Sequence, residues 1–126
     1  MANELILIIE DNEKNRKLIR DLLQTKGYQT IESESAEDGL RLAEERKPSL
    51  VLMDIQLSGM DGIRAMKELK GKPPTRTIPV MAITASAMTH NSESMLAEGF
   101  DAYQTKPFNL PQFIAEIARL IGQPGS

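Results

Sequence analysis

The chain has 126 residues, 40% of them hydrophobic and 26% charged, which is typical of one globular domain and excludes a disordered or fibrous chain. It has no cysteine and a single histidine, so disulfides, zinc–thiolate sites and thiol catalysis are excluded, and a cytoplasmic location is favoured. The net charge of -3 and the aromatic content of 4% disfavour nucleic acid as a partner, and no apolar run is long enough to span a membrane.

Five short segments predict β-strands. Three are continuous apolar runs, as expected for parallel strands that are covered on both faces, and two are weaker. In chain order the strands are expected at residues 5–9, 29–32, 50–53, 80–83 and 102–104.

A helical pattern follows each strand. Asn12 is placed to cap the first helix, which would end near Gly27, and Ser35 is placed to cap the second. The poorest pattern covers residues 88–98. In chain order, the apolar residues expected to face inward are Leu18, Ile19, Leu22 and Leu23, then Ala36, Leu40 and Ala43, then Ile63, Met66 and Leu69, then Met95 and Leu96, and finally Phe113, Ile114, Ile117, Ala118 and Ile121.

The regular alternation of strands and helices predicts the fold class. Connections of this length between successive strands indicate βαβ units, in which a parallel sheet carries helices on both faces. We therefore predict an α/β protein with a doubly wound five-stranded parallel sheet, flavodoxin-like, with strand order 2-1-3-4-5. Residues 1–122 would form this single domain, and residues 123–126 a disordered tail.

Polar residues follow the predicted strands at their carboxyl ends. Glu10 and Asp11 follow the first strand, Asp54 the third, Thr84 the fourth, and Lys106 lies shortly after the fifth. Because the carboxyl ends of parallel strands meet at one edge, these side chains are expected to converge. Three carboxylates at one place repel each other, and an oxygen-only ligand set favours a hard cation such as Mg²⁺.

The same residue types suit phosphoryl transfer. A carboxylate can accept a phosphoryl group, and Asp54 is the best-placed candidate. Mg²⁺ and Lys106 would neutralise the phosphoryl oxygens, while Thr84 could donate a hydrogen bond to one of them. Each residue alone is usually a helix cap or a surface residue, so the prediction depends on their occurring together on adjacent strands.

These residues lie in segments that resemble the receiver domain of two-component response regulators, most of all DivK-type single-domain regulators. Receivers attached to hybrid kinases look similar. The matching segments run in the family order and are residues 7–12, 52–57, 59–62, 78–85 and 106–108.

The resemblance implies roles for particular residues. Asp54 would be the phosphoacceptor, Glu10 and Asp11 would bind Mg²⁺ together with the main-chain carbonyl of Gln56, and Thr84 and Lys106 would contact the phosphoryl group. Tyr103 would be the switch aromatic residue, whose side chain responds to movement of Thr84.

Three further features of the sequence are left open. Lys106-Pro107 is a candidate cis peptide by resemblance. Ser58 replaces the usual proline, which puts the rigidity of the loop after the acceptor in doubt. Asn15 and Arg16 lie where sensor kinases dock in the family, although an exposed helix face would explain them equally well.

The predicted function is a phosphorylation-controlled signalling switch that receives its phosphoryl group from a histidine kinase or a phosphotransfer protein. It would catalyse only its own phosphorylation and dephosphorylation and would act as a monomer or weak dimer. No DNA-binding or other output module follows Gly122, so the output would be a contact with a downstream protein. This contact would use the face formed by residues 88–98, by the last strand and by the last helix.

Two other classes are weaker. A Mg²⁺-dependent phosphohydrolase with an aspartate nucleophile would need an acid where this chain has Gln56. A nucleotide- or flavin-binding module would need a glycine-rich phosphate loop, which is absent.

Overall fold

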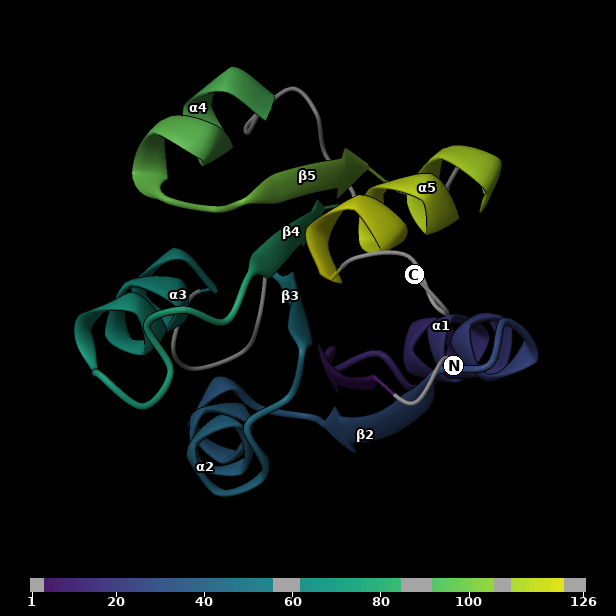
Figure 1. Cartoon of the computed structure of the whole chain (residues 1–126), viewed down its shortest axis with the longest axis horizontal. Coiled ribbons are helices and arrows are strands. Elements are labelled where there is room, and N and C mark those ends of the chain that lie inside the picture. Colours follow the sequence, from purple (N-terminus) through teal and green to yellow (C-terminus); the bar gives the residue numbers. More distant parts are fainter. Residues whose placement is uncertain (1–3, 56–61, 85–91, 106–109, 122–126) are drawn as a thin grey trace.

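The computed structural model describes residues 4–55, 62–84, 92–105 and 110–121 (Figure 1). Strands and helices alternate along these residues. In chain order they are β1 (Leu5–Ile9), α1 (Glu13–Thr25), β2 (Gln29–Ser33), α2 (Ala36–Arg46), β3 (Leu50–Asp54), α3 (Gly62–Gly71), β4 (Val80–Thr84), α4 (Ser92–Glu98), β5 (Ala102–Thr105) and α5 (Leu110–Ile121).

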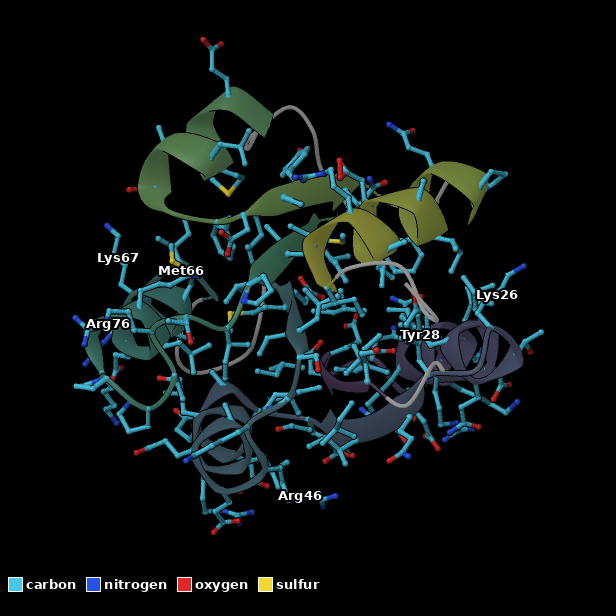
Figure 2. All side chains as sticks on the ribbon, viewed as in Figure 1. Lys26, Tyr28, Arg46, Met66, Lys67 and Arg76 are labelled. Carbon is cyan, nitrogen blue, oxygen red and sulfur yellow. The ribbon has the colours of Figure 1, made fainter. Side chains whose placement is uncertain are left out.

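The five strands form one parallel sheet in the order β2-β1-β3-β4-β5, which confirms the predicted fold class. Figure 1 shows α1 and α5 on one face of the sheet and α2 and α3 on the other. In Figure 2, Lys26 and Tyr28 accordingly lie on the α1 side, and Met66 and Lys67 lie on the α3 side.

The core is divided by the sheet into two apolar clusters. Successive residues of a strand point to opposite faces, so β1, β3, β4 and β5 each supply both clusters, whereas β2 contributes only Ile31. On the face of α2, α3 and α4, the strand residues include Leu7, Ile9, Val51, Met53, Val80 and Ala82. On the face of α1 and α5, they include Ile6, Ile8, Leu50, Leu52, Met81 and Ile83. This burial on both faces explains why these strands read as unbroken apolar runs.

The helix ends agree with the sequence signals. The side chain of Asn12 accepts a hydrogen bond from the main-chain N–H of Asn15, and that of Ser35 accepts one from Asp38. Gly27 follows α1 with φ of 94°, a conformation that favours glycine.

Two inward residues were predicted wrongly. Leu18 is 55% exposed and Leu96 is 49% exposed, whereas Ile19, Leu23 and Met95 are fully buried. In both α1 and α4, fewer residues are buried than the apolar pattern of the sequence suggests. Leu18 and Leu96 lie at the edge of that pattern, outside the buried face of their helix. The described part of α4 begins at Ser92, and the earlier residues of its predicted range lie outside the described residues.

Candidate functional site

The register of the sheet brings two carboxylates to the same level on neighbouring strands. Ile9 of β1 pairs with Met53 of β3, and each is followed directly by an acidic residue, Glu10 and Asp54. The main-chain N–H of Glu10 also donates to the carbonyl of Ser33 at 3.0 Å, so the residue is anchored on the side of β2 as well.

Glu10, Asp11 and Asp54 form a carboxylate cluster. One oxygen from each can be chosen so that the three lie within 4.8 Å of one another. Glu10 is 1% exposed and Asp54 is 5% exposed, while Asp11 is open to solvent. Carboxylates at this separation repel each other, and a bound cation would relieve the repulsion.

The turn between β1 and α1 fixes the first two members of the cluster. The side-chain Oε2 of Glu10 accepts a hydrogen bond from the main-chain N–H of Asn12 at 3.1 Å, and Asn12 in turn caps α1. The acidic pair therefore lies in a short turn that is held at both ends, by the sheet and by the helix.

Arg16 lies beneath this turn. Its Nη1 donates to the carbonyl oxygen of Glu10 at 2.8 Å, and its other nitrogens lie 3.3 Å from Glu32 and 3.4 Å from Glu34. Its side chain is only 11% exposed, so the expectation of an exposed helix face is wrong for this residue.

The start of α3 packs against the residues that carry the third carboxylate. The N–H of Gly62 donates to the carbonyl of Ile55 at 3.3 Å. A Cβ atom at Gly62 would lie 2.6 Å from Cα of Ile55 and 2.8 Å from the carbonyl oxygen of Asp54. Glycine at this position therefore allows the helix to approach the end of β3.

The donor set fits Mg²⁺ in its chemistry. All three side chains offer carboxylate oxygens, and hard divalent cations prefer oxygen ligands. Mg²⁺ usually keeps several waters beside one or two carboxylates. The exposure of Asp11 leaves one side of the cluster accessible to such waters.

For the other predicted site residues, the structure describes only a part. Thr84 is the last residue of β4 and directly follows Ile83, the partner of Asp54 in the sheet register. Gln56, Ser58 and Lys106-Pro107 lie outside the described residues.

Tyr103 lies on β5 and is half-buried against the apolar cluster on the α2–α3–α4 face. Burial raises the pKa of its phenol above the ordinary value. Its main chain pairs with Ala82 of β4, two residues before Thr84. The structure thus places this aromatic residue beside the strand that leads to Thr84.

Comparison with known proteins gives consistent matches over nearly the whole chain. A family model described as the response regulator receiver domain matches residues 6–118. The polar-differentiation response regulator DivK of Brucella ovis is 44% identical over 117 residues, which are 93% of this chain and 95% of that protein.

Solved structures agree with these matches. The receiver domain of the sensor histidine kinase PA1611 of Pseudomonas aeruginosa PAO1, with a magnesium ion in its active site cleft, has a TM-score of 0.88 and 31% identity and covers 97% of this chain and 100% of that one. The signal receiver domain of a signal transduction histidine kinase from Syntrophus aciditrophicus has a TM-score of 0.85 and 30% identity, over 94% of this chain and 89% of that one.

Proposed function

The chain belongs to the response regulator receiver domain family and is a phosphoacceptor switch of two-component signalling, and we propose that Asp54 is the residue that receives the phosphoryl group. The observation that supports this assignment is the carboxylate cluster. Asp54 ends β3 with its side chain within 4.8 Å of Glu10 and Asp11, so a phosphoryl group on Asp54 would be made next to a cation site.

Mg²⁺ is the cofactor that we propose. Glu10, Asp11 and Asp54 would hold it with the main-chain carbonyl of Gln56, and the bound ion would neutralise charge on the oxygens of the transferring phosphoryl group. The Pseudomonas receiver domain, with its magnesium ion, supports this choice.

The chain's own residues would then perform the transfer. One carboxylate oxygen of Asp54 attacks the phosphorus of a donor phosphohistidine, and the P–N bond breaks as the new P–O bond forms. The bonding electrons leave with the imidazole nitrogen. Thr84 would donate a hydrogen bond to one phosphoryl oxygen and Lys106 would form an ion pair with another.

The family is one of signalling proteins rather than of enzymes with an external substrate. We propose that the only reactions the chain promotes are its own phosphorylation and the hydrolysis of its own acyl phosphate. The phosphohydrolase alternative is not favoured, because the receiver family matches residues 6–118.

The partners that we propose are proteins. A histidine kinase or a histidine phosphotransfer protein would donate the phosphoryl group, and a downstream protein would bind the face formed by α4, β5 and α5. The chain would act as a monomer or weak dimer in the cytoplasm, without binding nucleic acid. Among the described residues, no helix combines the length and apolar character needed to cross a membrane.

Incubation with acetyl phosphate and Mg²⁺ followed by intact mass measurement tests the acceptor. Wild type should gain the mass of one phosphoryl group, and Asp54→Asn should gain none, because an amide is not a competent nucleophile. Asp38→Asn, on the exposed surface of α2, is the matched control and should label like wild type. Labelling of Asp54→Asn at the wild-type level would contradict the assignment.

A further inference from the structure

We propose that Arg16 is a positioning residue for the metal site, in which its guanidinium sets the peptide that joins Glu10 to Asp11. This inference rests on the proposed function, because it assumes that these two residues bind Mg²⁺. It gives a positioning role to a residue whose described contacts are with Glu10, Glu32 and Glu34 rather than with the proposed acceptor.

The contacts of Arg16 join three segments of the chain. Nη1 donates to the carbonyl oxygen of Glu10 at 2.8 Å, at the end of β1. Nε lies 3.3 Å from Oε1 of Glu32 on β2, and Nη2 lies 3.4 Å from Oε1 of Glu34 just after β2. The planar guanidinium thus spans the ends of two neighbouring strands from its place on α1.

The bond to Glu10 acts on both acidic residues because a peptide unit is planar. Fixing the carbonyl of Glu10 fixes the plane of the peptide that follows, and therefore the position from which the Asp11 side chain starts. The N–H of Glu10 is already held by the carbonyl of Ser33 at 3.0 Å. With Arg16 in place, the main chain of Glu10 is held on both its donor and its acceptor side.

Burial supports a role inside the structure rather than at its surface. The side chain of Arg16 is 11% exposed, whereas that of Arg20, one turn further along α1, is 32% exposed. A hydrogen bond from the charged guanidinium in this mostly buried position is stronger than one between neutral groups. Removing Arg16 would leave the carbonyl oxygen of Glu10 without this donor.

A second arginine nearby, Arg20, allows the positioning effect of Arg16 to be distinguished from the effect of its charge alone. Arg20 also binds Glu32, with Nη1 3.2 Å from Oε2, but none of its described contacts reaches Glu10. Removing either arginine takes away one positive charge from the same network. A purely electrostatic effect would make the nearby site more negative and tighten Mg²⁺ binding, whereas loss of positioning would weaken it.

The experiment compares Arg16→Gln with Arg20→Gln by isothermal titration calorimetry with Mg²⁺. We expect the Kd of Arg16→Gln to rise about tenfold, the size of effect found when a group behind a metal ligand is removed. Arg20→Gln should bind as tightly as wild type or slightly more tightly. If Arg16→Gln binds Mg²⁺ as tightly as Arg20→Gln, the inference is overturned while the proposed function stands.

Two further measurements guard against a general loss of structure. The amide resonance of Asp11 in Mg²⁺-free protein should shift in Arg16→Gln and stay in place in Arg20→Gln, since only the first variant frees the peptide. Arg16→Lys keeps the charge but cannot span all three acceptors, so its Mg²⁺ affinity should also fall. Wild-type affinity in Arg16→Lys, or an unmoved Asp11 resonance in Arg16→Gln, would overturn the inference. Failure of wild type itself to bind Mg²⁺ would overturn the proposed function as well.

Discussion

Asp11 is the solvent-exposed member of the carboxylate cluster, and this makes it the best residue with which to test the metal site. Replacing it with alanine removes a ligand and a negative charge without opening a cavity in the core. We expect Asp11→Ala to weaken Mg²⁺ binding by at least about tenfold. Removing a group that merely supports a metal ligand already lowers metal affinity by that factor, and Asp11 is proposed as a ligand itself. Calorimetric titration with Mg²⁺ would measure it.

The same variant carries a second expectation, of opposite sign. Without Mg²⁺, removing Asp11 relieves its repulsion with Glu10 and Asp54, so the melting temperature in EDTA should stay the same or rise. Glu13→Ala, an exposed acidic residue in the first turn of α1 outside the cluster, serves as the control. An unaltered Mg²⁺ affinity in Asp11→Ala would remove this residue from the site.

The role of Arg16 shows what sequence reasoning missed among the residues near the site. Arg16, Ile19 and Leu23 follow the i, i+3, i+7 spacing of one helix face, and both apolar members are fully buried. This spacing was available in the sequence and places the arginine on the inner face. It was overlooked because a charged residue is usually assigned to the surface, whereas here three oxygen acceptors at the strand ends accommodate it.

At the scale of elements, the close packing of α3 against the end of β3 depends on Gly62. A methyl group there would come within 2.6 Å of main-chain Cα of Ile55, which cannot rotate away. We expect Gly62→Ala to lower the free energy of unfolding by about 1–3 kcal/mol, the usual cost of overpacking. Urea denaturation would measure it. The loss of phosphorylation rate should accompany the loss of stability, because the displaced residues adjoin Asp54.

Gly71 at the other end of α3 is the matched control. A Cβ atom there meets no atom within 4 Å, so Gly71→Ala should be neutral or stabilise the helix by up to about 1 kcal/mol. If Gly62→Ala and Gly71→Ala lowered the free energy of unfolding equally, the close packing at Gly62 would not be the cause of the loss.

Asp101 ties α3, β4 and β5 together at the end of the sheet opposite the carboxylate cluster. Its Oδ2 accepts from the main-chain N–H of Val80 and from Nζ of Lys70, each at 2.8 Å, and Lys70 also donates to the carbonyl of Ile78. We expect Asp101→Ala to destabilise the fold by about 1–3 kcal/mol, since it leaves the N–H of Val80 without this acceptor.

Urea denaturation of Asp101→Ala beside Asp38→Ala would check this expectation. Asp38 also forms an ion pair, with Arg41 at 3.2 Å, but on an exposed helix surface where such pairs contribute little. If both variants lower the free energy of unfolding equally, the hydrogen bonds and ion pair of Asp101 contribute no more than a surface ion pair.

The elements themselves were largely predictable, for physical reasons that also explain the errors. Burial on both faces selects unbroken apolar runs, and these locate β1, β3 and β4 without further information. A run does not show where a strand ends, so β3 and β4 each extend one residue further than predicted, to Asp54 and Thr84. Periodicity likewise gives the width of an apolar stripe but not which edge the sheet covers, which is why Leu18 was misplaced.

At the scale of the whole molecule, topology brings the carboxylates together. The predicted order 2-1-3-4-5 makes β1 and β3 neighbours although 40 residues lie between Ile9, the last residue of β1, and Leu50, the first of β3. This order follows from rules for parallel strands rather than from any local signal. The convergence of Glu10, Asp11 and Asp54 could therefore be predicted. The hydrogen bonds behind them could not, because they depend on side-chain conformations that only the packed structure defines.

The arrangement of the molecule also suggests how phosphorylation of Asp54 would be transmitted. A phosphoryl group adds negative charge and oxygens at the end of β3, and the neighbouring strand β4 ends in Thr84. Along the chain α4 follows β4, and among those residues of α4 whose side chains the structure describes, only Met95 is fully buried. The ion pair of Glu98 with Lys67 of α3, at 3.2 Å, joins exposed side chains and is therefore weak. Such a helix shifts more easily than one with several buried anchors.

We therefore expect the change to appear in α4 and at Tyr103, which packs against the same apolar cluster as Met95. Beryllofluoride, a mimic of the bound phosphoryl group, should move the backbone amide resonances of residues 92–98 and of Tyr103 in the presence of Mg²⁺. Those of Lys17 and Asp21, on the exposed side of α1, should move little. Thr84→Ala should still accept a phosphoryl group but show smaller shifts in α4, because the proposed hydrogen bond that draws β4 toward the phosphoryl group is lost. Large shifts confined to Glu10, Asp11 and the residues around Asp54 would contradict this path of transmission.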